Sequence, residues 1–234
     1  MLGTDTCPMK SVVRRIGQQL FTALSEKGLA VLVNHGIADE KLKAVYADLD
    51  NFCALPEGSQ AQYLRNPESN HGYIRPGIDT LDKQSNKQEL RHTFNITSLS
   101  AASMPADEEV PAFCQHTVPL AHDLTNLSRV LLQALAYALG LPPAQLLDCH
   151  SGMLASDGVN PSAMRLLYYP PVKLNGSDKW QAVGHLPGAI LVQPGQLLAS
   201  WTTNLLPALV LYIYFYILGP MIMLCFIGLI VKEI

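Results

Sequence analysis

The sequence predicts an α+β fold in which helices come first and most strands follow. Apolar residues recur at helical spacing in the first part of the chain, and short apolar runs bounded by proline and glycine come later. No internal repeat is present. The chain has 234 residues and is 49% hydrophobic, which suffices for one or two packed domains and excludes a disordered chain.

The first segment alternates helix and strand patterns. Residues 8–27 have the spacing of an amphipathic helix, and Gly28 stands where a glycine commonly ends one. The apolar run 29–33 is typical of a strand. After the turn Asn34-His35-Gly36, in which we expect His35 to be a turn residue, Asp39 is expected to cap a helix that ends near Ala54.

The remaining elements follow a polar stretch over 57–93, which we expect to be rich in loops. A strand is predicted over 92–96, and the longest helix over 112–139 ends at Gly140. Two further strands are expected, 164–169 and 188–192.

Charge divides the chain into two parts. Only 15% of the residues are charged, against about 25% in a typical soluble domain, and the net charge is −3, so no basic face indicates nucleic-acid binding. Residues 180–231 contain no Asp, Glu, Lys or Arg. The low charge therefore belongs to the C-terminal quarter.

The tail from Leu205 to Val231 is charge-free, and 23 of its 27 residues are hydrophobic. About 20 apolar residues suffice for a helix to cross a bilayer. The tail therefore predicts a transmembrane helix over 205–231 that would anchor the chain with most of it facing the cytosol. The alternative is read-through sequence without an evolved role.

The five cysteines are scattered and form no CxxC motif. This pattern favours reduced thiols in the cytoplasm over a disulfide framework. The N-terminus lacks an apolar stretch, so we expect no signal peptide. The pairs Cys114/His116 and Cys149/His150 lack the spacing of a zinc finger, and we expect no metal there.

Several motifs, in a specific order and spacing, resemble one family over roughly residues 8–204. They are Val31-Leu32-Val33-Asn34-His35-Gly36-Ile37, Leu55-Pro56-Glu57, His71-Gly72-Tyr73 with Arg75-Pro76-Gly77, Lys87 to Phe94, Arg165 to Pro171, and Pro187 to Val192 with the later Trp201-Thr202. The family is the isopenicillin-N-synthase-like branch of the 2-oxoglutarate/Fe(II)-dependent dioxygenases.

The resemblance implies a double-stranded β-helix, or jelly roll, wrapped by N-terminal helices. It divides the chain into a dioxygenase N-terminal-like region (1–160), an incomplete fragment of the β-helix (161–204) and the apolar tail (205–231). It also implies Fe(II) on two histidines and one carboxylate, 2-oxoglutarate as co-substrate and a small molecule as the oxidised substrate.

The iron ligands that the family would require are absent from this sequence. None of the seven histidines is followed two residues later by Asp or Glu, and His185 is the only one near a ligand position. Residues 181–184 run almost directly into His185-Leu186-Pro187, where the family has a few tens of residues more. We therefore expect no catalytic residue, no metal ligand set and no bound cofactor in this chain.

Two residues match the side of the family's site that holds 2-oxoglutarate. Tyr169 aligns with a tyrosine that often contacts the keto acid, and Arg165 begins the same motif. The alternative for Tyr169 is a strand tyrosine with its ring in the core, and for Arg165 a structural ion pair. The family often has Asn where Leu167 stands, which removes one co-substrate contact.

The sequence therefore predicts an oxidoreductase lineage and a chain that is catalytically inactive as it stands. It would be an alternative splice form or the product of a mis-predicted gene model. The alternative function is a tail-anchored, non-catalytic membrane protein that acts through protein contacts, or a splice product without function.

Overall fold

The computed structural model describes residues 8–78, 91–150, 153–154, 158, 160, 162–168, 188–208 and 222–226. Within this part the protein combines a layer of helices with two small β-sheets, so the predicted mixture of helix and sheet is confirmed. The predictions for Tyr169 and His185 fall on residues outside the described part.

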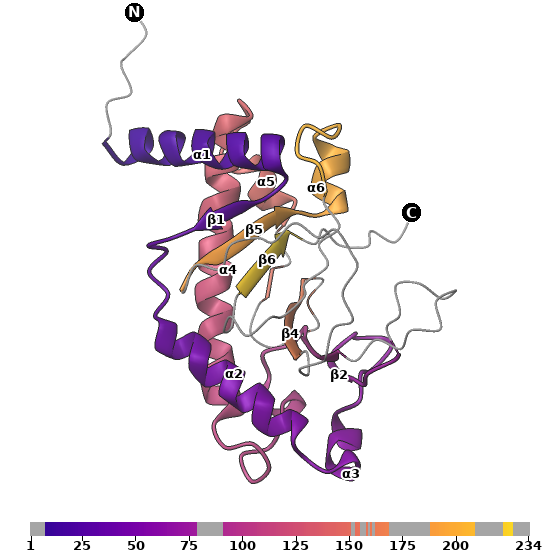
Figure 1. Cartoon of the computed structure of the whole chain (residues 1–234). Coiled ribbons are helices and arrows are strands. Elements are labelled where there is room, and N and C mark those ends of the chain that lie inside the picture. Colours follow the sequence, from indigo (N-terminus) through magenta and orange to yellow (C-terminus); the bar gives the residue numbers. More distant parts are fainter. Residues whose placement is uncertain are drawn as a thin grey trace, which may run out of the picture.

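Three long helices form one layer: α1 (Pro8–Lys27), α2 (Asp39–Cys53) and α4 (Phe113–Ala138). Both α1 and α2 pack on α4, which runs through the length of the molecule in Figure 1. Shorter helical segments connect the rest: α3 (Glu57–Gln60), η1 (Ala61–Tyr63), η2 (Ala101–Ser103), α5 (Gln145–Asp148) and α6 (Gln196–Trp201).

The contact of α1 with α4 depends on a glycine. A Cβ atom at Gly17 would lie 2.1 Å from the backbone oxygen of Ala134, so only hydrogen allows the helices to approach this closely. The first helix ends as predicted, because Gly28 adopts a φ of 69° and donates its N–H to the carbonyl oxygen of Leu24.

Sheet B is antiparallel and has the order β2 (Gly72–Ile74), β3 (His92–Ile96), β4 (Met164–Tyr168). Its central strand sets the register, with Asn95 opposite Gly72 on one side and Arg165 on the other. The sequence predicts β3 and β4 but misses β2, which has only three residues and lies in the stretch expected to be loops.

Sheet A has the order β1 (Ala30–Leu32), β5 (Ile190–Pro194), β6 (Ile222–Phe226). The β1 and β5 strands are antiparallel, while β5 and β6 are parallel. Figure 1 shows this sheet in front of α4, beneath α1. The sheet therefore joins the start of the chain to its last quarter.

The core lies between the helical layer and one face of each sheet. Phe52 is fully buried and makes edge-to-face contacts with Tyr73 and Phe94 from sheet B, at ring-centroid distances of 5.1 and 5.2 Å. Phe113 of α4 joins the cluster 5.4 Å from Phe94. The helices and sheet B thus share one continuous aromatic core.

The predicted helix over 205–231 requires a correction. Residues 205–208 are not helical, and residues 222–226 form β6 beside β5. An uninterrupted apolar run has neither helical nor strand periodicity, so pairing with a neighbouring strand can decide its structure. Among the helices of the described part, none is both long enough and apolar enough to cross a membrane.

A second correction concerns the start of α2. The capping position is taken by Ala38, which makes no side-chain capping hydrogen bond, and Asp39 is the first residue of the helix. A carboxylate in the first turn still interacts favourably with the positive end of the helix dipole.

Candidate functional site

The face of sheet B that points away from the aromatic core is the candidate site. Side chains alternate along a strand, so Phe94 and Ile96 enter the core while Thr93 and Asn95 lie on the opposite face. We call this surface the Asn95 face; its residues are Gly72, Ile74, Thr93, Asn95, Arg165 and Leu167.

Arg165, predicted to lie on the 2-oxoglutarate side, is on this face. Its side chain is exposed on β4, and within the described residues no partner of its guanidinium is found. Leu167 lies two positions further along the same face and is half-buried. The planar fork of a guanidinium suits a carboxylate, whereas the side chain of Leu167 offers no polar contact.

Asn95 is the site residue that the sequence analysis missed. It is fully buried, and its Nδ2 donates to Oδ1 of Asn70 over 3.2 Å. Its own Oδ1 is buried and accepts no hydrogen bond in the described structure. The alternation of polar and apolar residues from Thr93 to Ile96 indicates the face on which Asn95 lies, but only the register places it beside Arg165.

The donor groups of the described residues do not fit an iron centre of two histidines and one carboxylate. Across the described residues, no three His, Cys, Asp or Glu side chains come close enough together to hold a metal ion. The sequence, moreover, contains no His-x-Asp or His-x-Glu anywhere. His185 and Tyr169 lie outside the described residues, so their predicted places remain predictions.

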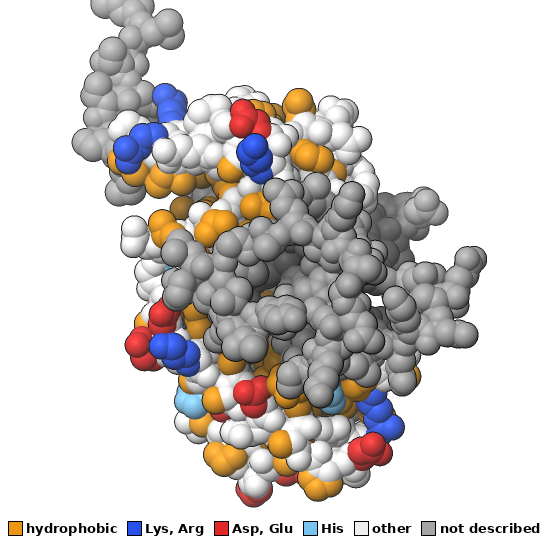
Figure 2. Space-filling model, in the orientation of Figure 1, with side chains coloured by type: hydrophobic (Ala, Val, Ile, Leu, Met, Phe, Trp, Pro, Cys, Tyr) orange, Lys and Arg blue, Asp and Glu red, His pale blue; other side chains and the backbone are white. Residues whose placement is uncertain are grey.

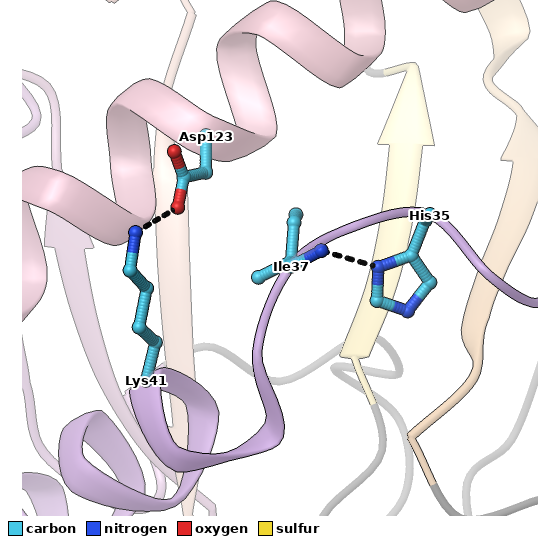
Figure 3. Close-up of polar contacts among 4 residues, drawn as sticks. All are labelled: His35, Ile37, Lys41 and Asp123. Atoms are coloured by element: carbon cyan, nitrogen blue, oxygen red, sulfur yellow. Dashed lines mark hydrogen bonds and ion pairs between the residues drawn. The ribbon is translucent and has the colours of Figure 1, made fainter.

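Several of the described histidines have structural partners. His35 lies in the turn between β1 and α2, as expected, and its Nδ1 accepts the N–H of Ile37 over 3.2 Å (Figure 3). The other ring nitrogen must then carry the proton, and Nε2 donates to the carbonyl oxygen of Gly188 over 2.7 Å. His35 thereby fastens the start of the chain to the residues before β5.

His71 organises the loop that follows β3. Its Nδ1 accepts the backbone N–H groups of Thr97 and Ser98 over 3.2 and 3.3 Å, and Nε2 donates to the carbonyl oxygen of Ser103 over 2.8 Å. Burial lowers the pKa of His71. The ring is therefore held neutral as a structural connector.

His92 is the partner of a buried tyrosine. The hydroxyl of Tyr73 and Nδ1 of His92 are hydrogen-bonded over 2.7 Å, on the core side of sheet B. Burial raises the pKa of Tyr73 to about 12 and lowers the pKa of His92, so both groups stay neutral near pH 7. This bond crosses between β2 and β3 and belongs to the core.

The two Cys/His pairs do not form a metal site among the described residues. His116 Nδ1 lies 2.8 Å from Oδ2 of Asp48, which joins α4 to α2. His150 Nδ1 donates to the carbonyl oxygen of Leu146 over 2.7 Å.

Charged groups on the described surface mix both signs. In Figure 2, Lys, Arg, Asp and Glu side chains lie among one another over α1 and α2. This distribution agrees with the net charge of −3.

Comparison with known proteins defines the class. Residues 8–118 match a family model described as "non-haem dioxygenase in morphine synthesis N-terminal". A 2OG-Fe(II) oxygenase family protein from Caulobacter crescentus aligns with a TM-score of 0.69 at 22% identity, over 86% of this chain and 75% of that one. A full-length Neurospora crassa protein, crystallised in complex with alpha-KG, aligns with a TM-score of 0.69 at 17% identity, over 85% and 73%. These likenesses define an oxygenase fold of the jelly-roll type.

Curated relatives agree with this class. The chain is 24% identical to 2-oxoglutarate-dependent dioxygenase 11 of Oryza sativa, over 71% of this chain and 44% of that protein. It is 26% identical to gibberellin 20 oxidase 1-D of Triticum aestivum, over 73% and 46%. The chain is similar to 2-oxoglutarate/Fe(II)-dependent dioxygenases over most of its length, and it spans about half the length of these two relatives.

Proposed function

We propose that this chain is a non-catalytic member of its family. It keeps the helical layer and the Asn95 face but lacks the ligands for iron. The observation that carries the proposal is the donor set: the sequence has no His-x-Asp, and the described residues bring no metal-binding group together. A single imidazole such as that of His185 cannot complete a facial triad of two histidines and one carboxylate.

The part of the ancestral site that we propose to be retained is a carboxylate contact. Arg165 would hold a carboxylate of 2-oxoglutarate or a related acid through its fork of N–H donors. Tyr169, which lies four residues further along the same motif, would add a hydroxyl to the same ligand. No chemical step at iron follows, because the donor set does not fit the metal.

Turnover of 2-oxoglutarate tests the proposal. Purified full chain is incubated with Fe(II) and labelled 2-oxoglutarate, and succinate is measured. We expect no succinate above a metal-free control. Succinate that appears only with Fe(II) would show that the chain assembles an iron site after all and would overturn the proposal.

Sequencing of the transcript across codons 180–205 tests the origin of the chain. We propose that an internal stretch between the strand at 164–168 and β5 is missing through alternative splicing or an incorrect gene model. An in-frame His-x-Asp segment in the transcript would show that the gene encodes an iron-binding form. Such a form would oxidise a small molecule, and its reduced cysteines favour the cytoplasm.

A further inference from the structure

The loop that follows β3 closes around one buried imidazole. This loop consists of residues 98–104 and contains η2. At its start the N–H of Ser98 donates to His71 Nδ1 over 3.3 Å, and near its end the carbonyl oxygen of Ser103 accepts from His71 Nε2 over 2.8 Å. The two ends of the loop are therefore joined through a single ring.

Among the described residues, no other hydrogen bond connects the 98–104 loop to the rest of the protein. The remaining hydrogen bonds of its backbone and side chains lie within the loop itself. Thr97, the residue before the loop, is held separately, because its hydroxyl donates to the carbonyl oxygen of Ser69 and its own carbonyl oxygen accepts from Asn160. The hydrogen bonding of the loop thus depends on His71, whereas the end of β3 has attachments of its own.

The neutral form of His71 is the form that fits this arrangement. Nδ1 accepts from two backbone N–H groups, those of Thr97 and Ser98, so the proton of the neutral ring is on Nε2. A second proton on Nδ1 would place a donor against two donors and leave both buried N–H groups without an acceptor. The hydrogen bond from Nε2 to Ser103 could persist, so protonation acts on the start of the loop.

Among the described residues, no charged group contacts His71 to offset this conflict. The ring of Phe94 meets it edge to face at a centroid distance of 6.0 Å, and its other partners are backbone groups of the loop. Glu68, on the turn that carries His71, is exposed, and the titratable residues of β2 and β3, Tyr73 and His92, bond to each other. Burial lowers the pKa of His71, and a backbone hydrogen bond raises it by less.

We infer that protonation of His71 opens the 98–104 loop locally, while the helices and sheet B stay folded. The inference is independent of the proposed function, because it involves neither Arg165 nor iron. Opening exposes Leu99 and Met104, which are 7% and 3% exposed in the closed loop, and so creates an apolar surface that is present only in acid.

The sign of the pH dependence follows from the closed loop. Because the pKa of His71 is lowered in the closed loop, the open loop binds the proton more tightly. The loop is therefore closed most firmly above pH 6.5, and its opening increases as pH falls from 6.5 through the lowered pKa.

Hydrogen exchange of the purified full chain tests the inference. Exchange is read by mass spectrometry at pH 7.5 and pH 5.0 and corrected for the intrinsic pH dependence of amide exchange. We expect protection of peptides that cover the 98–104 loop to fall about five- to tenfold at pH 5.0, the factor that a pKa difference of about one between open and closed loop supplies. Peptides from α2 and α4 should keep their protection. Unchanged protection of the loop, or an equal loss in α4, would overturn the inference.

Two matched variants assign the effect to one histidine. His71→Gln keeps an acceptor oxygen and a donor N–H but does not titrate between pH 5.0 and 7.5, so protection of the loop should no longer depend on pH. His92→Gln replaces the other histidine whose pKa is lowered by burial, and it should leave the acid opening unchanged.

Acid opening that persists in His71→Gln, or that disappears in His92→Gln, would overturn the inference. If His71→Gln does not fold, the place where the wild-type chain loses protection and the behaviour of His92→Gln still decide. Succinate formation with Fe(II) would overturn the proposed function and leave the opening of the loop unaffected, so the two failures are distinguishable.

Discussion

The two sheets have the same number of described strands but are held in different ways. Sheet B is antiparallel throughout, packs on the aromatic core and is reinforced by the Tyr73–His92 bond. Sheet A pairs β1 with a strand more than 150 residues away, and His35 ties the two ends together at Gly188. The comparison teaches that sheet B is stabilised by the aromatic core beneath it and by a side-chain bond between its own strands, whereas β5 depends on contacts supplied by the start of the chain.

The largest loss of stability is expected from a substitution in the core beneath sheet B. Phe52→Ala removes a ring that contacts four other aromatic rings, and we expect a loss of about 3–5 kcal/mol in the free energy of unfolding. Denaturant unfolding measures it. Ile78→Ala, at a side chain that is 64% exposed, is the control and should cost far less. Equal costs would show that the aromatic cluster does not anchor sheet B.

The next effect concerns the loop after β3. His71→Leu leaves the N–H groups of Thr97 and Ser98 without their acceptor, and we expect a loss of about 2–3 kcal/mol at pH 8. His122→Leu, at an exposed histidine of α4, serves as the matched control. A loss no greater than that of the control would show that His71 does not stabilise the loop after β3.

The same residue gives a pH dependence with a defined sign. Burial lowers the pKa of folded His71 and of folded His92 below the ordinary value of 6.5, so the unfolded chain binds more protons in this window. The contribution of these two histidines to the free energy of unfolding is fully present above pH 6.5. It is lost as pH falls from 6.5 through the lowered pKa values. The His71→Leu variant should show a shallower loss; an unchanged slope would contradict this assignment.

A smaller effect separates sheet A from sheet B. Gly188 has a φ of 69°, and a Cβ there would lie 2.7 Å from Oδ1 of Asp39, whereas at Gly36, with a φ of 81°, a Cβ would meet nothing within 4 Å. Both alanine variants cost about 1–2 kcal/mol for the left-handed backbone. We expect Gly188→Ala to cost more.

Hydrogen exchange read by mass spectrometry locates that effect. Gly188→Ala should raise exchange in β1 and β5 and leave sheet B unchanged. Faster exchange in both sheets to the same extent would show that the two sheets unfold as one unit. Sheets A and B would then not be stabilised separately.

The smallest effect is on the surface. Lys41 Nζ lies 2.5 Å from Oδ2 of Asp123, as Figure 3 shows, and both side chains are partly exposed. Exposed ion pairs contribute only about 0–1 kcal/mol. We expect Lys41→Gln to lower stability within that range, and added salt to diminish the difference. A loss as large as that of His71→Leu would mean that α2 is held by charge rather than by its apolar face.

Much of the helical layer can be predicted from sequence, because its signals are local. The bounds 8–27 follow from apolar residues at helical spacing and from Gly28, which the chain needs in a left-handed conformation. The strand at 92–96 was also predicted correctly, since its residues alternate. In contrast, β6 lies in a run where almost every residue is apolar, so no period distinguishes a strand from a helix.

The candidate site is predictable only in part. Arg165 could be selected because it begins a recognisable motif. Asn95 could not, because nothing local marks an asparagine in a strand as unsatisfied. Its importance arises from the register, which places Gly72 and Arg165 beside it from strands far apart in the sequence.

The pairing of β1 with β5 has a consequence for synthesis on the ribosome. Ala30 pairs with Val192, which at about 5–20 residues per second is made roughly 8–30 s later. During this interval the edge of β1 lacks its β5 partner, although α1 and α2 can pack on α4 once α4 has been made. Chaperone occupancy on nascent chains should therefore persist until β5 has left the exit tunnel, which is shortly after sheet B is complete.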